Sequence, residues 1–173
     1  MGEAKFDGFI YRIHPFLLPS IWCPLLVAQI ILLFFVDNPE TNLALIYAGL
    51  VIWFLSGIFG LWPIHEFKKR GGVPKGKSFV NTTVFVESGP YAIVRHPQYT
   101  AGILLSLAII LVKQHWVITA LGIPAIILMY IDTMKADQYG VEKFGETYRQ
   151  YMERVPRANF LSGLVRRLRK TEH

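Results

Sequence analysis

Cysteine and charged side chains are scarce in this sequence. The only cysteine is Cys23, so a disulfide-stapled scaffold is excluded. Charged residues make up 17% of the 173 residues and hydrophobic residues 53%, whereas about 25% of residues are charged in an average soluble domain. Intrinsic disorder is excluded as well, because it requires low hydrophobicity and high net charge. The length is that of a single domain.

Formal charge is absent from four long stretches, if histidine is counted as neutral: residues 13–36, 41–64, 96–112 and 114–131. A helix needs about 20 apolar residues to cross a bilayer, within a range of about 17 to 25. The first two stretches meet this requirement, and the last two, which only Lys113 separates, are typical of a helical hairpin. We therefore expect one all-α integral membrane domain over residues 1–173, with transmembrane helices near residues 15–36, 42–65, 97–112 and 115–134.

The basic residues lie almost entirely on one side of these predicted helices. Residues 1–14 hold two lysines or arginines, residues 66–95 hold six and the tail from residue 135 holds nine, whereas the two opposite loops hold only Lys113. This 17-to-1 distribution is a strong positive-inside signal, and it places both termini, the long middle loop and the tail (135–173) in the cytoplasm. The net charge of +6 then lies along an anionic leaflet. The expected partner is therefore the lipid bilayer, and no nucleic acid is needed to explain the charge.

Three cytoplasmic segments have recognisable local patterns. Residues 79–86 are β-branched and aromatic, which predicts an extended segment or a short hairpin. Apolar residues recur at helical spacing from Met134 to Met152, which predicts an amphipathic helix that ends before Pro156. Residues 160–170 alternate apolar and basic side chains, which is typical of an amphipathic helix on a membrane surface. We expect this last segment to anchor to lipid, with little effect on ligand binding.

The start of the third predicted helix combines groups that could bind a ligand. Pro97 suits the first position of a helix, so the free N–H groups and positive dipole end of that helix face the cytoplasm, where a carboxylate can bind. Arg95 adds a bidentate donor and His96 a titratable ring. Tyr91 and Tyr99 add rings that could pack on a base or a sulfonium. The alternative is an interfacial anchor, since all these side chains favour headgroups.

Two aspartates near the end of the fourth predicted helix are the second candidate. Asp137 falls on the apolar stripe of the following helix, where an unpaired carboxylate would be costly. The alternative is an exposed ion pair between Asp137 and Lys135 or Arg149. Asp132 lies near the expected membrane boundary, and it is either a functional carboxylate or a marker of the headgroup region. No metal site is predicted.

Together these blocks resemble the integral-membrane methyltransferases of the isoprenylcysteine carboxyl methyltransferase and phospholipid methyltransferase family. That family has a G-x-Y…R-H-P-x-Y-x-G block at the start of a late transmembrane helix. After a helical hairpin follows E-E-x-x-L-x-x-x-F-G-x-x-Y-x-x-Y, and then V-P. The matching residues here are Gly89, Tyr91, Arg95, His96, Pro97, Tyr99 and Gly102 in the first block, and Phe144, Gly145, Tyr148, Tyr151, Val155 and Pro156 in the second. The sequence departs from the pattern where the paired glutamates fall on Ala136 and Asp137 and the leucine falls on Gly140.

The resemblance implies a methyltransferase that uses S-adenosylmethionine without a Rossmann domain and acts on a lipophilic or membrane-accessible acceptor. The implied cofactor-binding residues are Gly89, Tyr91, His96, Pro97, Tyr99, Asp137 and Tyr148. The implied catalytic residues are Arg95, His96 and Arg154.

The acceptor stays open among a prenylcysteine-like carboxylate, a phospholipid amine and a small thiol. A carboxylate needs a cationic partner, for which the candidates are Arg95, Arg154 and Arg157. An amine needs a base, for which the candidates are His96 and Asp137. The departure at Ala136 favours a different class of function, a non-catalytic multi-pass membrane scaffold that keeps the fold.

Overall fold

The computed structural model describes residues 12, 14–72, 76 and 83–171, and every regular element among them is helical. These elements are α2 (Leu17–Leu32), α3 (Leu43–Arg70), the 3₁₀ turn η1 (Gly89–Ala92), α4 (Pro97–Lys113), α5 (Trp116–Phe144), α6 (Glu146–Arg154) and α7 (Phe160–Thr171). The all-helical class expected from the sequence is confirmed for this part of the chain. Of the extended segment expected at 79–86, residues 79–82 lie outside the described residues and residues 83–86 form no strand.

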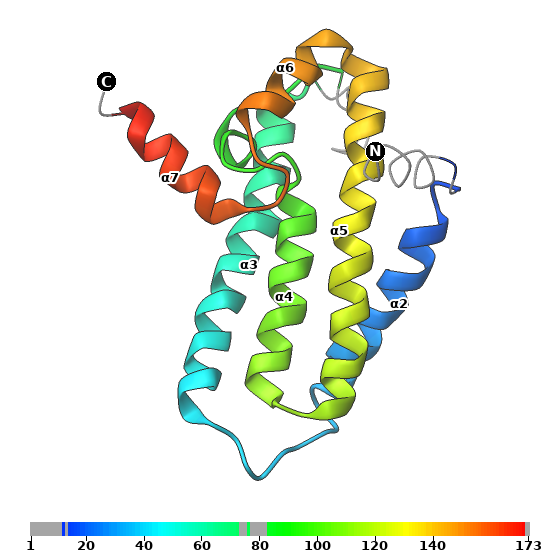
Figure 1. The fold of residues 1–173 in the computed structure, drawn as a ribbon, viewed down its shortest axis with the longest axis vertical. Helices are drawn as coiled ribbons and strands as arrows, with labels where there is room; N and C mark the ends of the chain where they lie inside the picture. The colour runs from blue at the N-terminus through cyan, green and yellow to red at the C-terminus, as the bar shows by residue number, and fades with distance from the viewer. Residues whose placement is uncertain (1–11, 13, 73–75, 77–82, 172–173) are drawn as a thin grey trace, which may run out of the picture.

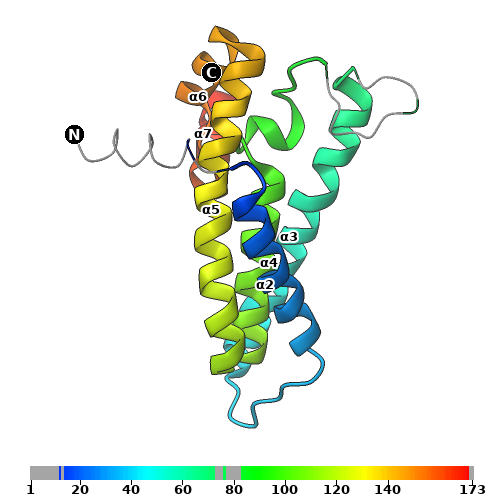
Figure 2. The same cartoon turned by 90° about the vertical axis from the view of Figure 1, so that its right-hand side faces the viewer.

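Four long helices run side by side in the order α3, α4, α5 and α2 (Figure 1). α4 packs between α3 and α5, while α2 packs on α5 and touches α4 (Figure 2). The end of α3, the start of α4, the end of α5 and the short helix α6 gather at one end of this bundle, together with η1 (Figure 1). The two sequence blocks are therefore brought to the same end of the molecule.

Two of these helices, α3 and α5, are long and apolar enough to cross a membrane, and α2 and α4 are shorter apolar helices of 16 and 17 residues. All four begin within two residues of the positions expected from the sequence. α3 and α5 continue beyond their expected ends, to Arg70 and Phe144. Asp137 consequently lies on α5 itself and not on a separate tail helix.

The bundle has an apolar surface and a partly polar interior. Trp53, Phe54 and Leu61 on α3 are 58–72% exposed. Gln29 and Ser106, by contrast, are completely buried, and the Ser106 hydroxyl donates a hydrogen bond to Gln29 Oε1 at 2.8 Å. Side-chain hydrogen bonds between helices and apolar side chains on the outside are typical of proteins in lipid. This surface fits association with a membrane.

The turn between α4 and α5 lies where the sequence predicts it, directly after Lys113. Gln114 ends α4 with a positive φ of 48°. Its side chain exchanges two hydrogen bonds with the main chain of Asn42, from Asn42 N at 2.8 Å and to Asn42 O at 3.0 Å. The Asn42 side chain in turn caps the start of α3 by accepting from Ala44 N at 2.9 Å. The connection between α2 and α3 is thus hydrogen-bonded to the turn between α4 and α5.

The amphipathic helix expected to run from Met134 to Pro156 is broken, and this expectation is wrong. Gly145 has a φ of +61° and separates α5 from α6. Apolar spacing continues across the break, so the periodicity alone could not reveal it. Glycine permits this backbone conformation at little cost, and the break allows α6 to fold back toward α4.

Candidate functional site

The turn η1 packs tightly against the end of α3. Gly89 has a φ of +60°, and a Cβ there would lie 3.0 Å from Glu66 Cδ and 3.2 Å from Trp62 Nε1. Glu66 is buried, accepts a hydrogen bond from the Ser88 hydroxyl at 2.5 Å and pairs with Arg70 at 3.1 Å. Glycine is therefore required at position 89 both for the backbone conformation and for the close approach to α3.

Main-chain hydrogen bonds join the two sequence blocks directly. Arg95 N donates to Pro156 O at 3.0 Å, and His96 N donates to Arg157 O at 3.2 Å. The segment between α6 and α7 thus lies alongside the start of α4. Pro156 fits this segment because its carbonyl oxygen accepts the hydrogen bond from Arg95 N, and this contact does not need the main-chain N–H that proline lacks.

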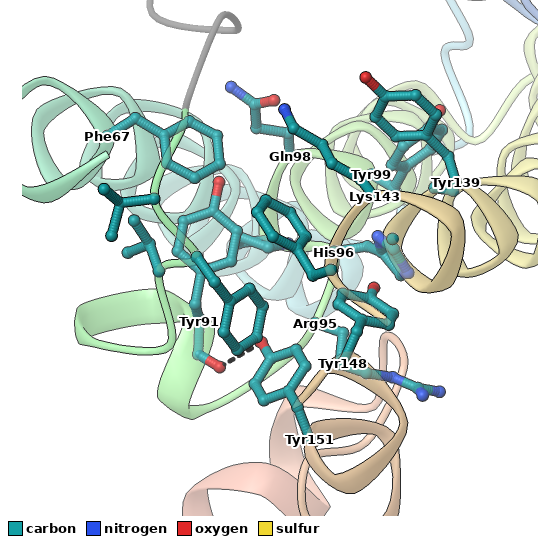
Figure 3. A pocket seen from close by; sticks show the side chains of 17 residues that line it. Phe67, Tyr91, Arg95, His96, Gln98, Tyr99, Tyr139, Lys143, Tyr148 and Tyr151 are labelled. Carbon is teal, nitrogen blue, oxygen red and sulfur yellow. Dashed lines mark hydrogen bonds between the residues drawn. The ribbon is translucent and has the colours of Figure 1, made fainter. Parts of the chain in front are cut away.

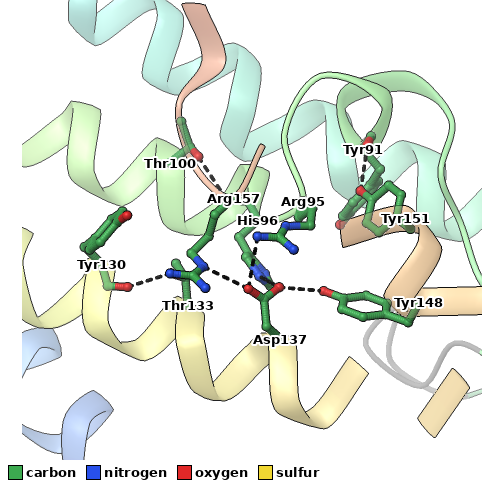
Figure 4. Close-up of polar contacts among 10 residues, drawn as sticks. All are labelled: Tyr91, Arg95, His96, Thr100, Tyr130, Thr133, Asp137, Tyr148, Tyr151 and Arg157. Carbon is green, nitrogen blue, oxygen red and sulfur yellow. Dashed lines mark hydrogen bonds and ion pairs between the residues drawn. The ribbon is translucent and has the colours of Figure 1, made fainter. Parts of the chain in front are cut away.

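Asp137 is the centre of a buried polar cluster (Figure 4). Its Oδ1 lies 2.7 Å from His96 Nε2 and accepts a hydrogen bond from the Tyr148 hydroxyl at 3.1 Å. Its Oδ2 accepts from Arg157 Nε at 2.8 Å and pairs with Arg95 Nη2 at 3.3 Å. A carboxylate offers about four acceptor positions, so these four partners use its full capacity.

The surroundings of Asp137 decide between the two interpretations of this residue. Its side chain is only 2% exposed, and the two arginines with which it forms ion pairs are Arg95 and Arg157. The alternative of an exposed ion pair with Lys135 or Arg149 is therefore wrong. One carboxylate between two guanidinium groups leaves the cluster with an excess of positive charge.

A cavity of about 300 Å³ opens beside this cluster (Figure 3). Its walls come from the end of α3, the segment before η1, η1 itself, the start of α4, the end of α5 and α6. The lining residues are Phe67, Val84, Phe85, Val86, Tyr91, Arg95, His96, Pro97, Gln98, Tyr99, Ala136, Tyr139, Gly140, Lys143, Phe144, Tyr148 and Tyr151. The volume lies at the lower end of the range of about 300–1,000 Å³ that is usual for small-molecule sites.

The mouth of the cavity is formed by those lining residues that are also exposed, namely Val84, Gln98, Tyr139 and Lys143. The Lys143 ammonium lies 5.7 Å from the centre of the Tyr139 ring and 5.2 Å from that of Phe144. These distances are within the range of cation–π attraction. A positive charge therefore stands beside the entrance, supported by aromatic rings.

The interior of the cavity is aromatic. Phe67 stacks on Tyr91 with ring centres 4.7 Å apart, and Phe85 lies edge-on to Tyr148 and Tyr151. Burial raises the pKa of Tyr91, Tyr148 and Tyr151 above the ordinary value, so their hydroxyls remain protonated near neutral pH. The Tyr151 hydroxyl donates to Tyr91 O at 2.6 Å, which ties α6 to η1.

A second buried carboxylate supports one wall of the cavity. Asp132 on α5 is 3% exposed and accepts hydrogen bonds from Trp22 Nε1 at 3.0 Å and from the Tyr99 hydroxyl at 3.2 Å. It therefore connects α2 to a cavity-lining tyrosine, and it is not a solvated marker of the headgroup region. Within the described part of the chain, no group of three or more histidine, cysteine, aspartate or glutamate side chains could hold a metal ion.

One family model matches the chain, that of the phospholipid methyltransferases, over residues 44–135. This range is more than half of the 173 residues. The chain belongs to this family. The match includes α3, η1, α4 and most of α5, and hence the first sequence block, but it ends before Asp137. Comparisons with curated proteins and with solved structures gave no match.

This member of the phospholipid methyltransferase family brings most of the residues expected at the site to one place. Of nine such residues, six line the cavity: Tyr91, Arg95, His96, Pro97, Tyr99 and Tyr148. Gly89 packs on α3 instead, and Asp137 contacts Arg95 and His96 without lining the cavity. Arg154 points elsewhere, because it pairs with Glu87 at 3.1 Å on the surface. The functional roles of all nine residues remain predictions.

Gly140 and Lys143 on α5 were not identified as cavity residues from the sequence. Ala136, Gly140 and Lys143 line the cavity at a spacing of four and three residues, which is that of neighbours on a helix. A Cβ at Gly140 would collide with the ring of Tyr148, so glycine allows that ring to lie against α5. The helical spacing was present in the sequence, since residues 134–152 were expected to be helical, but it did not show which face of that helix would line a cavity.

Proposed function

We propose that this chain is a multi-pass membrane methyltransferase that uses S-adenosylmethionine to methylate a lipophilic or membrane-accessible acceptor. The proposal rests on one observation: the two sequence blocks meet around a single aromatic cavity at one end of an apolar helix bundle. Membership of a methyltransferase family supports methyl transfer as the reaction. A prenylcysteine-like carboxylate, a phospholipid amine and a small thiol are the acceptor classes to be compared.

The cavity residues fit the chemical groups of S-adenosylmethionine. Arg95 Nε is buried and has no hydrogen-bond partner among the described residues, so it can donate to a carboxylate. The start of α4 at Pro97 adds the positive end of a helix dipole to the same wall. The faces of Tyr91, Tyr99 and Tyr148 suit a sulfonium or a purine. When bound, this cofactor supplies an activated methyl group.

The contribution of the protein is then positioning and the exclusion of water. Asp137 acts as a positioning residue, because it fixes the His96 ring and the Arg95 guanidinium from behind the cavity wall. Tyr148 has a double role, since its ring lines the cavity while its hydroxyl binds Asp137.

The proposed topology has four membrane crossings, formed by α2 to α5, with both termini and the connection between α3 and α4 in the cytoplasm. The distribution of 17 basic residues against one supports this orientation. α2 and α4, with 16 and 17 residues, are near the lower limit of about 17 for a crossing. The cavity would then open at the cytoplasmic face, where a soluble donor and a membrane acceptor can meet.

Binding of labelled S-adenosylmethionine to the detergent-purified protein tests this proposal, followed by transfer of the labelled methyl group to lipid and thiol acceptors. His96→Ala should weaken binding or turnover while the protein stays folded. His115→Ala is the matched control, because His115 lies at the opposite end of the bundle, at the start of α5. If the protein neither binds S-adenosylmethionine nor transfers its methyl group, the result favours the non-catalytic scaffold, which is the alternative that Ala136 supports.

A further inference from the structure

The helix α7 has two faces with different surroundings. One face packs on the bundle: the ring centres of Phe160 and Phe59 on α3 are 5.6 Å apart, and a Cβ at Gly163 would collide with Ile93 O. The other face is an apolar stripe at the spacing of one side of a helix, with side chains that are 43–62% exposed: Leu161, Leu164, Val165 and Leu168. This apolar stripe is available to a partner outside the chain.

The packed face of α7 binds both ends of η1. Arg166 Nη2 donates to Ala92 O at 2.6 Å, and Arg167 Nη1 donates to Gly89 O at 3.3 Å. Between these two carbonyl groups lies Tyr91, which lines the cavity. A shift of α7 would therefore move one wall of the cavity.

The position of α7 favours lipid as its partner. The helix begins beside α3 and runs outward from the bundle (Figure 1). Phe59, on which it begins, belongs to the uncharged stretch 41–64 and lies about three helical turns before the end of α3 at Arg70. Leu61 in the same stretch is 72% exposed. The apolar stripe thus starts close to the apolar outer surface of a helix that is long enough to cross a membrane.

The charge of α7 favours anionic lipid in particular. Residues 160–171 include three arginines and one lysine, and no aspartate or glutamate. Arg169 is exposed and, at 3.6 residues per turn, lies at the edge of the apolar stripe. A basic amphipathic helix binds at the boundary between headgroups and acyl chains, and anionic lipids strengthen this binding. The gain is about fivefold for each basic residue near an anionic surface.

We propose that α7 binds the anionic surface of the leaflet and thereby holds η1 in the cavity wall. In the packed position the apolar stripe and the outside of α3 can contact lipid together, so lipid favours this position over one in which α7 has left η1. Anionic lipid then increases the affinity of the cavity for its ligand while bound outside it. The effect on ligand affinity rests on the proposed function, whereas the ordering of η1 does not.

The first experiment needs no cofactor and compares nanodiscs of phosphatidylcholine with nanodiscs that also contain phosphatidylglycerol. An environment-sensitive fluorophore, attached through Leu168→Cys in a Cys23→Ser background, reports the surroundings of the apolar stripe. Hydrogen exchange of the unlabelled protein reports the order of η1, through the amides of Tyr91 and Ile93 that are hydrogen-bonded within it. With phosphatidylglycerol we expect a more apolar signal and exchange at least about fivefold slower.

Charge at position 169 provides the matched pair of variants for this experiment. Arg169→Glu should remove both effects of phosphatidylglycerol, and Arg169→Lys should keep them, because the hydrogen bonds to η1 come from Arg166 and Arg167 instead. Equal signals in the two lipids, or a change in fluorescence without slower exchange, would overturn the proposal. A signal that depends on protein concentration and not on lipid would show that a second copy covers the apolar stripe, with the same consequence.

The second experiment measures the affinity for labelled S-adenosylmethionine in the same two lipids. Coupling between two sites typically changes affinity by about 5- to 150-fold, and we expect binding at least about fivefold tighter with phosphatidylglycerol. Gly163→Val should separate α7 from the chain at Ile93 and remove this dependence, whereas Ser162→Val, at an exposed neighbouring position, should keep it.

The two experiments distinguish failure of this proposal from failure of the proposed function. Equal affinity in the two lipids for the unaltered protein would overturn the coupling, whether or not Gly163→Val folds. If S-adenosylmethionine binds in neither lipid, the proposed function fails, while the hydrogen exchange of η1 still decides whether anionic lipid orders this wall of the cavity.

Discussion

Replacing Asp137 by asparagine tests whether the buried cluster holds the site together. Asparagine keeps the shape of the side chain but removes its charge, and one of its two terminal groups becomes an NH₂ donor. That NH₂ must face either the guanidinium groups of Arg95 and Arg157, or the Tyr148 hydroxyl and the His96 ring. The change therefore removes the counter-charge of two arginines. It also sets the NH₂ against a guanidinium group, unless the NH₂ faces Tyr148 and His96, which can accept a hydrogen bond.

The expected magnitude follows from the burial of the partners. Removing one member of a buried ion pair costs about 3–5 kcal/mol. The Arg157 side chain is 27% exposed and can regain contact with water, whereas the Arg95 side chain is 7% exposed and cannot. We expect the free energy of unfolding of Asp137→Asn to fall by about 3 kcal/mol, at the lower end of that range. Cofactor binding should weaken at the same time, because His96 and Arg95 both line the cavity.

Thermal unfolding of the purified protein in detergent, with and without S-adenosylmethionine, measures both effects. Asp37→Asn is the matched control: it removes the carboxylate of an ion pair with Lys113, 2.8 Å long, in which the Asp37 side chain is 93% exposed. Such a pair contributes little, so the control should unfold at the same temperature as the unaltered protein. If Asp137→Asn also unfolded at that temperature, Asp137 would not stabilise the site and the reasoning would be refuted.

Three further predictions concern the cavity, the tail and the topology. Gly140→Leu should displace the Tyr148 ring from α5 and weaken cofactor binding by about tenfold in a binding titration; unchanged affinity would show that the ring can move freely. A tryptophan at Leu164, on the exposed apolar face of α7, should be quenched by brominated lipids, and no quenching would exclude contact of α7 with the bilayer. In a cysteine-free background, an impermeant thiol reagent added outside intact cells should label Asn38→Cys but not Ser162→Cys, and the reverse result would invert the proposed orientation.

The positions of the helices could be predicted from the sequence because they depend on local properties. Uncharged stretches, Lys113 between two of them and proline at position 97 locate the starts of four helices to within two residues. The aromatic and basic residues around Pro97 likewise marked one part of the cavity wall, which includes Tyr91, Arg95, His96 and Tyr99. In each case the relevant information lies within one turn or one stretch of chain.

The partners of Asp137 could not be predicted, because they depend on contacts across the fold. His96 is 41 residues away in the chain and Arg157 is 20 residues away. An apolar stripe at helical spacing showed that this carboxylate needs partners, but no spacing rule identifies them. The contacts predict that cofactor affinity and stability fall together when Asp137 loses its charge.

The contacts of α7 argue against a division of the tail into a binding part and a lipid anchor. Arg166 donates to Ala92 O at 2.6 Å and Arg167 to Gly89 O at 3.3 Å, so α7 holds both ends of η1. A Cβ at Gly163 would collide with Ile93 O, which shows how closely the helix approaches the chain beyond that turn. The leucines of α7 remain exposed on another face. Because η1 provides one wall of the cavity, a lipid surface that binds the exposed face of α7 would also stabilise the site.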